Sequence, residues 1–193
     1  MVPDSDAGSC PPTFLASYIV EGAPAAGGFV YSPWVTANLT IEKPPEETAW
    51  DNVIYDSLAL GYVDATHMSL RSVIERSVWT FYWALAEQTP TVARSMLLDR
   101  DWMHWREAIL RDLSRAHRDI RDRVSRIDVM RIGHAMARPV PGFLASETRR
   151  QFTTLRGPVI YANSDLSGFS IFEEAQYRGV MAADRALSDI GRA

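Results

Sequence analysis

The stretch Gly157-Pro158-Val159-Ile160-Tyr161-Ala162-Asn163-Ser164-Asp165-Leu166-Ser167-Gly168 is the part of the sequence that says most about the fold. Its apolar first half predicts a buried strand over Pro158–Asn163, and its polar second half, which ends in glycine, predicts a turn. A helix is expected to follow from about Ser170 to Leu187. The C-terminal part of the chain is therefore predicted to be a strand–turn–helix unit.

This turn carries groups that suit a ligand. The start of a helix leaves backbone N–H groups unpaired and concentrates the positive end of the helix dipole, which favours an anionic or electron-rich group. Asp165 can accept hydrogen bonds from ligand hydroxyls, and Gly168 allows a ligand close to the backbone. Many α/β proteins contain such a unit and bind nothing with it. On these residues alone, a binding site and a plain structural turn are both open interpretations.

The helix after the turn has a narrow side made of small residues, namely Ala175, Gly179, Ala182 and Ala186. Such a side lets a helix lie close to a sheet or to a cofactor domain. The carboxylates of Glu173 and Glu174 fall in the first helical turn, where the dipole favours them.

Upstream of this unit, short β-prone segments alternate with turn residues, which predicts a mostly antiparallel sheet. The expected strands are 14–21, Phe29–Lys43, Val53–Tyr55, Gly61–Thr66, Val78–Leu85 and Val129–Arg138. Helices are expected at Thr89–Asp99, Asp101–Ala116, Arg118–Arg126 and Ser146–Phe152. The helix from Asp101 has an apolar stripe of Trp102, Trp105, Ile109 and Leu113, which predicts core packing. The expected fold class is α+β.

Composition limits the class of protein. With 47% hydrophobic residues, a net charge of −4 and six Trp, 193 residues can form one sizeable core or two small lobes. The charge gives no basic patch for a nucleic acid, and the single Cys10 cannot form a disulfide framework. No secretory signal and no apolar run of about 18 residues is seen, so a soluble, cytoplasmic protein without membrane contact is the default expectation.

The closing segments resemble a known family. The run Gly157–Gly168, followed by Ile171-Phe172-Glu173-Glu174-Ala175-Gln176-Tyr177-Arg178-Gly179, resembles the closing FAD-contact motif of the flavin amine-oxidase superfamily. Five upstream segments are similar to the substrate-domain sheet and return segment of bacterial proteins of that superfamily: Tyr31–Leu39, Ala49–Ser57, Leu60–His67, Ile127–Arg131 and Gly133–Pro139. The resemblance covers nearly the whole chain after the first residues.

The resemblance implies FAD as the cofactor and oxidation of an amine or amino acid, or a related desaturation, as the reaction. It implies that the acidic residue of the turn, Asp165, contacts the ribityl–phosphate region of FAD, and that the backbone after it faces the flavin. The implied cofactor-binding residues are Ser164, Asp165, Leu166, Ser167, Gly168 and Phe169. A C-terminal strand–helix would then complete a Rossmann-like FAD domain.

One feature of the family is missing. The family opens with a strand, a G-x-G-x-x-G turn and a helix that hold the ADP part of FAD, and this sequence has no such motif. We therefore expect the chain to be the C-terminal half of such an enzyme, with a larger FAD-binding partner subunit that carries the motif. The expected organisation is a flexible leader at 1–13, a substrate-binding sheet with helices at 14–126, and a return segment with the FAD-contacting unit at 127–193.

Beside a flavin, His67 and His134 are the candidate catalytic residues, because a histidine can orient a substrate or move a proton. A hydrogen-bonded structural histidine is the competing interpretation for both. His104 and His117 fall in charged helices and are expected at the surface, and no histidine spacing indicates a metal site. Trp50, Tyr55 and Tyr62 could line an aromatic substrate pocket, although core packing explains them equally well. The alternative function is a non-catalytic subunit that stabilises or regulates a flavoprotein partner.

Overall fold

The computed structural model describes residues 26–45, 49–69, 73–155, 157 and 159–191. The chain divides into two compact units, one made of residues 1–32 and 134–193 and the other of residues 33–133. The predicted leader at 1–13 and the predicted strand at 14–21 lie outside the described residues. The division falls inside two long strands that belong to both units, whereas the sequence placed a boundary at residue 126.

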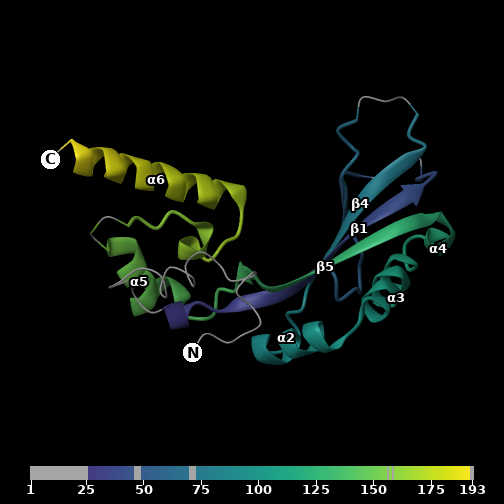
Figure 1. The fold of residues 1–193 in the computed structure, drawn as a ribbon, viewed down its shortest axis with the longest axis horizontal. Helices are drawn as coiled ribbons and strands as arrows, with labels where there is room; N and C mark the ends of the chain where they lie inside the picture. The colour runs from purple at the N-terminus through teal and green to yellow at the C-terminus, as the bar shows by residue number, and fades with distance from the viewer. Residues whose placement is uncertain (1–25, 46–48, 70–72, 156, 158, 192–193) are drawn as a thin grey trace. The chain divides into compact units, whose positions relative to one another are not determined.

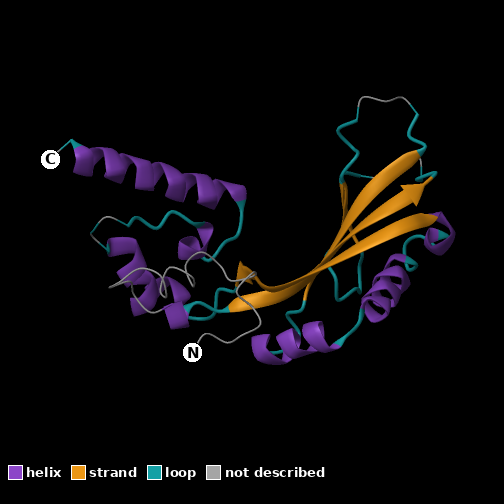
Figure 2. Ribbon diagram, viewed as in Figure 1, coloured by secondary structure: helices purple, strands orange, loops and turns teal. Residues whose placement is uncertain are grey.

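The sheet is five-stranded and antiparallel, as predicted, in the order β2-β3-β4-β1-β5. Figures 1 and 2 show its long strands β4, β1 and β5. Its strands are β1 (Tyr31–Glu42), β2 (Asp51–Val53), β3 (Gly61–Asp64), β4 (Arg76–Ala84) and β5 (Val124–Ala137). Along β1, alternate side chains from Val35 to Ile41 are buried, as the period-two pattern of the sequence requires. Its partner β4 sets Leu39 opposite Trp79.

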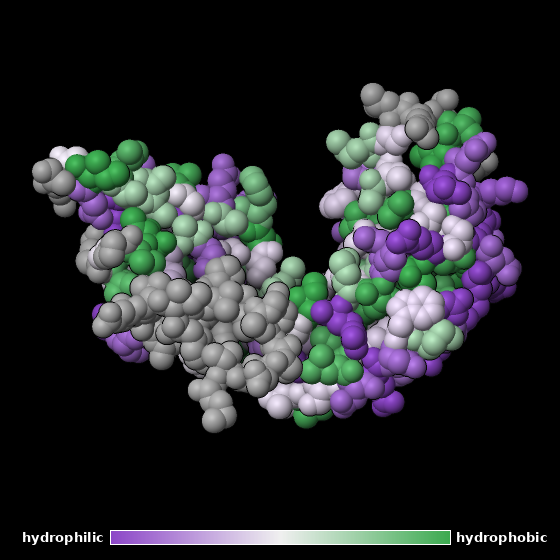
Figure 3. All heavy atoms as spheres, viewed as in Figure 1, coloured by the Kyte–Doolittle hydropathy of each residue, from purple (hydrophilic) through white to green (hydrophobic). Residues whose placement is uncertain are grey.

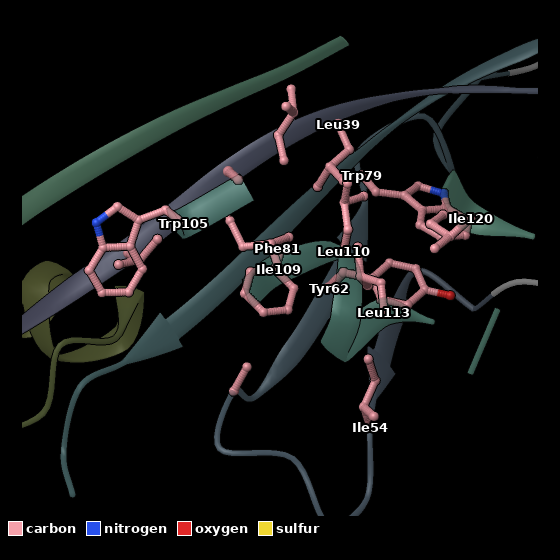
Figure 4. Packing of buried hydrophobic residues seen from close by; sticks show 14 of the residues in the cluster. Leu39, Ile54, Tyr62, Trp79, Phe81, Trp105, Ile109, Leu110, Leu113 and Ile120 are labelled. Atoms are coloured by element: carbon pink, nitrogen blue, oxygen red, sulfur yellow. The ribbon is translucent and has the colours of Figure 1, made fainter. Parts of the chain in front are cut away.

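Helices α2 (Pro90–Asp99), α3 (Trp102–Leu113) and α4 (Ile120–Arg123) belong to the second unit. The start of α3 is fixed by Asp101, whose carboxylate accepts a hydrogen bond from the backbone N–H of His104 at 2.8 Å. Trp105, Ile109 and Leu113 of α3 pack into the core with the sheet side chains (Figure 4). Trp102, the first residue of α3, is 47% exposed and is not part of that core. Its predicted place in the core was wrong.

The first unit has a small core of its own, made of Phe29, Tyr31, Ala137, Phe143, Phe152 and Leu166. Around it lie three short 3₁₀ turns and two helices: η1 (Ala26–Gly28), η2 (Phe143–Ala145), α5 (Glu147–Thr154), η3 (Ser164–Ser167) and α6 (Phe172–Ile190). The helices α5 and α6 match the two that the sequence predicts.

The strand predicted over Pro158–Asn163 is not formed by the described residues of that segment, which are 159–163. A strand needs a neighbour for its backbone hydrogen bonds, and the edges of the sheet at β2 and β5 do not pair with this segment. The side chains of Val159, Ile160 and Tyr161 are only partly buried. An apolar sequence alone therefore did not suffice to make a strand here.

Candidate functional site

The turn that the sequence singles out is a short 3₁₀ turn, η3, closed by Gly168. The backbone N–H of Gly168 donates to the carbonyl of Asp165 at 3.0 Å, and Gly168 has a φ of 74°. A Cβ atom at this position would lie 2.7 Å from Cε1 of Phe143. Glycine is therefore required twice, for its left-handed backbone and for the close packing of Phe143.

Two arginines hold η3 in place. Arg149 Nε donates to the carbonyl of Leu166 at 2.6 Å, and Arg178 Nε donates to Ser167 Oγ at 2.8 Å. The side chains of Leu166 and Ser167 are buried. The carbonyl of Leu166 and the hydroxyl of Ser167, two predicted cofactor residues, are therefore already hydrogen-bonded within the protein. Ser164 and Asp165 are partly exposed and Phe169 is exposed.

Asp165 is linked to a predicted catalytic histidine through Tyr31. The phenol of Tyr31 donates to Asp165 Oδ2 at 2.9 Å, and the ring of Tyr31 contacts that of His134 edge-on with the centroids 6.3 Å apart. Tyr31 itself is buried. The structure thus brings the predicted cofactor carboxylate and His134 together around a residue that sequence reasoning missed.

Helix α6 begins close to this cluster in the chain, at Phe172, two residues later than predicted. Its N-cap residue is Ile171, whose side chain cannot accept a hydrogen bond from the first backbone N–H groups of the helix. Glu173 and Glu174 lie in the first turn. The helix N-terminus therefore keeps its backbone N–H groups without a side-chain cap, which is the arrangement that suits an external acceptor.

The other predicted catalytic histidine, His67, lies in the second unit. Its ring is 6.0 Å from that of Trp50, and its Nδ1 is 2.9 Å from the carbonyl of Asp64. Both His67 and Trp50 are exposed. The pair predicted as catalytic and substrate-binding is thus an adjacent surface pair, with no buried pocket around it among the described cavities.

Tyr62 does not lie in a pocket and is a core residue instead, with 2% of its surface exposed. Its ring stacks on Trp79 at 4.2 Å, and its Oη lies 2.7 Å from His117 Nε2. Burial, with a smaller contribution from Asp64, raises the pKa of Tyr62 to about 12. Tyr55 has the opposite environment and is 87% exposed. The three predicted pocket residues, Trp50, Tyr55 and Tyr62, therefore do not form one aromatic pocket.

His117 was predicted at the surface and lies instead against the core. The centroid of its ring lies 4.8 Å from that of Trp79, and its Nε2 atom shares a hydrogen bond with Oη of Tyr62. Burial lowers the pKa of His117, Asp119 opposes that change, and Arg123 adds to it. The sequence did not predict this position, because His117 lies among charged residues, which are usually exposed.

A cavity of about 340 Å³ lies in the second unit, and none of the three predicted pocket residues lines it. It is lined by Asp56, Leu58, Ala59, Trp83, Ala108, Arg111, Asp112 and Arg115. Ser57 Oγ donates to Asp112 Oδ2 at 2.6 Å, which ties the loop before β3 to α3.

Within the described ranges, no group of three or more His, Cys, Asp or Glu side chains could hold a metal ion. None of the described helices has the length and apolar character needed to cross a membrane. None of the protein-family models matches the chain, and no curated protein is significantly similar to it.

Proposed function

We propose that this chain is the smaller half of a split FAD-dependent oxidoreductase, which oxidises an amine or an amino-acid-like substrate by hydride transfer to FAD. A larger partner chain with the G-x-G-x-x-G motif would hold the ADP end of the cofactor. The observation that carries the proposal is the carboxylate of Asp165, held by Tyr31 in a glycine-closed turn just before the uncapped start of α6.

The residues of this turn fit one end of FAD. The carboxylate of Asp165 is partly exposed and fixed in orientation, so it can accept hydrogen bonds from ribityl hydroxyls. Gly168 allows a close approach, and the start of α6 offers backbone N–H groups to the electron-rich edge of the flavin. Bound flavin would supply the redox chemistry, and the protein would supply position and electrostatics.

His134 has the position of a proton-transfer group in this proposal. It lies against Tyr31, which in turn holds Asp165. A histidine is the side chain whose charge changes most easily near neutral pH. We assign it the role of moving a proton or orienting the substrate near the cofactor. His67 belongs to the second unit, and its predicted catalytic role stays a prediction that does not depend on this cluster.

Helix α6 supports the existence of a partner. None of its 19 residues is buried, although it is amphipathic. Its least exposed residues are Glu174, Arg178, Ala182, Arg185 and Ala186. The apolar side chains of Phe172, Val180, Leu187 and Ile190 are exposed to solvent, and Figure 3 shows hydrophobic surface along α6. At 100° per residue these four side chains fall within about 80° of one another. We call them the α6 stripe.

Exposing the apolar side chains of the α6 stripe to water is energetically unfavourable. Phe172 is 75% exposed and Leu187 is 68% exposed. Contiguous exposed apolar side chains on a helix mark a surface that another protein covers. The segment 159–163, which is apolar and lacks a strand neighbour, is a second place where a partner's sheet could add hydrogen bonds.

The second candidate function is a non-catalytic subunit that stabilises or regulates a flavoprotein partner. It is favoured by the arginine contacts of η3, because Arg149 and Arg178 already occupy the carbonyl of Leu166 and the hydroxyl of Ser167. A turn whose polar groups are satisfied internally has fewer left for a cofactor. The α6 stripe would bind a partner protein in this function as well as in the enzyme.

Co-expression with a candidate partner from the same genome, a protein that carries the G-x-G-x-x-G motif, tests both functions. The enzyme proposal expects a yellow complex that is bleached by amines, with flavin content strongly reduced by Asp165→Asn and unchanged by Asp99→Asn, which alters an exposed carboxylate at the end of α2. A stable complex whose flavin content ignores Asp165→Asn supports the scaffold. Failure to form any complex contradicts both.

A further inference from the structure

A groove of about 510 Å³ follows the side of α6 opposite to the α6 stripe, entirely within the first unit. It is lined by the end of α5, by Ile160, Tyr161 and Leu166, and by one side of α6 that includes Arg178, Arg185 and Asp189. Its volume is in the range of small-ligand sites, and its lining combines apolar walls with convergent polar groups.

Arg185 contributes an unused guanidinium edge to this groove. Its Nε and Nη2 atoms are buried and form no hydrogen bond to any described residue. Its ion-pair neighbour Asp189 stays 3.8 Å from Nε, which is too far for a hydrogen bond. On α5, the same edge of Arg150 donates two hydrogen bonds to Glu147, at 2.8 and 2.6 Å. Arg185 therefore keeps free the edge that binds a carboxylate through two parallel hydrogen bonds.

A second donor lies in the same groove. The hydroxyl of Tyr161 is buried and has no hydrogen-bond partner in the described part of the chain. Burial raises the pKa of this phenol, so it keeps its proton at neutral pH and can donate. Buried polar groups are nearly always paired, because leaving them unpaired is costly. Two such groups lining one groove indicate that an acceptor belongs there.

The remaining lining defines the ligand. Arg178 is already engaged with Ser167, so Arg185 is the available cation of the groove. Ile160, Leu166 and Met181 provide apolar walls. The carboxylates of Asp184 and Asp189 disfavour a doubly charged phosphate more than they disfavour a singly charged group. Arg185 keeps 18% of its side chain exposed, so its guanidinium can turn toward an entering oxygen.

We propose that this groove binds a small monocarboxylate with an apolar body, whose carboxylate pairs with the Nε–Nη2 edge of Arg185 and accepts a hydrogen bond from Tyr161. Of the turn η3 only the side chain of Leu166 lines the groove, as an apolar wall, and neither Asp165 nor the α6 stripe lines it. Binding to the groove can be measured without flavin or partner, so its failure is distinguishable from a failure of the proposed flavin function.

Isothermal titration calorimetry of the purified full chain, without flavin or partner, tests the site with phenylacetate as the probe. We expect saturable binding of one phenylacetate per chain. Phenylacetamide, which has the same shape but no charge, should bind at least about tenfold more weakly, as should inorganic phosphate. Circular dichroism of each variant checks that the fold is retained.

Variants identify the groups involved. Arg185→Gln should weaken phenylacetate binding by about tenfold or more, Arg185→Lys by less, and Tyr161→Phe by about three- to tenfold. Asp189→Asn should tighten it, because Asp189 competes for the same guanidinium. The matched control Arg126→Gln, at an exposed arginine of the other unit, should change nothing.

Three outcomes overturn the proposal. They are equal affinity for phenylacetate and phenylacetamide, an affinity unchanged in folded Arg185→Gln, and the absence of saturation up to roughly tens of millimolar phenylacetate.

Discussion

The phenol of Tyr31 donates a hydrogen bond of 2.9 Å to the carboxylate of Asp165, 134 residues further along the chain. The bond joins the first residue of β1 to the turn η3, and both belong to the first unit. Tyr31 is buried and Asp165 is partly exposed, so the bond holds the carboxylate at the edge of the small core of the first unit. Loss of this hydrogen bond should lower the free energy of unfolding and weaken the binding of any ligand that Asp165 contacts.

Tyr31→Phe should lower the free energy of unfolding by about 1 to 2 kcal/mol, since a partly buried carboxylate loses a neutral donor. Denaturant unfolding measures this change. Tyr82→Phe is the matched control, because Tyr82 makes a similar bond of 2.7 Å to Asp51 at an exposed position, and it should cost about 0.5 kcal/mol or less. Equal losses of free energy of unfolding in the two variants would show that the Tyr31–Asp165 bond stabilises the fold no more than an exposed hydrogen bond does.

Three glycine-to-alanine variants separate backbone strain from crowding. At Gly168 a methyl group meets both a φ of 74° and the ring of Phe143, so a loss of about 2 kcal/mol or more is expected. At Gly142 the φ of 83° is similar but the space is open, so the loss should be about 1 kcal/mol. Gly179 lies within α6 with nothing near it, so alanine there should stabilise the helix by about 0.5 to 1 kcal/mol.

Thermal and denaturant unfolding of the three variants give these values directly. The order Gly168, Gly142, Gly179, from the largest loss to a gain, is the expected result. A Gly168→Ala protein as stable as Gly142→Ala would mean that Phe143 moves aside at no cost.

The burial of His117 predicts that the stability of the protein depends on pH. Burial lowers the pKa of His117 in the folded protein below its ordinary value of 6.5, so the unfolded chain takes up the proton at a higher pH. Stability should therefore be highest above about pH 6.5 and should fall as the pH drops from there through the lower folded pKa. The free energy of unfolding, measured from pH 8 to pH 5, follows this effect.

The variant His117→Gln removes the titrating ring, so its stability should fall less steeply between pH 7 and pH 5 than that of the wild type. His104→Gln, at an exposed position on α3, serves as the control and should keep the wild-type slope. Parallel curves for wild type and His117→Gln would exclude His117 as the source of the acid sensitivity.

The regular part of the fold follows from local patterns. Alternation from Val35 to Ile41 predicts β1, and the spacing of Trp105, Ile109 and Leu113 predicts the buried side of α3, because each pattern repeats with the period of its element. The segment 159–163 shows the limit of this reasoning. Its apolar residues match a strand, but whether a strand forms depends on a neighbouring strand that the sequence of the segment does not specify.

The candidate site was predicted only in part, because its partners come from distant segments. Asp165 and Gly168 could be chosen from turn chemistry, whereas Tyr31, Arg149 and Arg178 act on the turn from β1, α5 and α6. The burial of Tyr62 against His117 was equally hidden, since His117 lies among charged residues. Local sequence indicates which residues can do chemistry, and the long-range packing decides which of them meet.

The α6 stripe gives the last prediction, which concerns the partner. In co-expression with the candidate G-x-G-x-x-G partner, the double change Val180→Glu and Leu187→Glu should weaken the complex at least about tenfold, because two apolar contacts are replaced by charges that must lose water. The isolated chain should keep its free energy of unfolding within about 0.5 kcal/mol, since both side chains are exposed in it. Leu98→Glu, at a similarly exposed position on α2, is the control and should leave the complex intact. Size-exclusion chromatography of the complex and sedimentation of the isolated chain distinguish a heteromeric contact from self-association. A complex that tolerates both glutamates would mean that the partner binds elsewhere, and the stripe would then need another explanation.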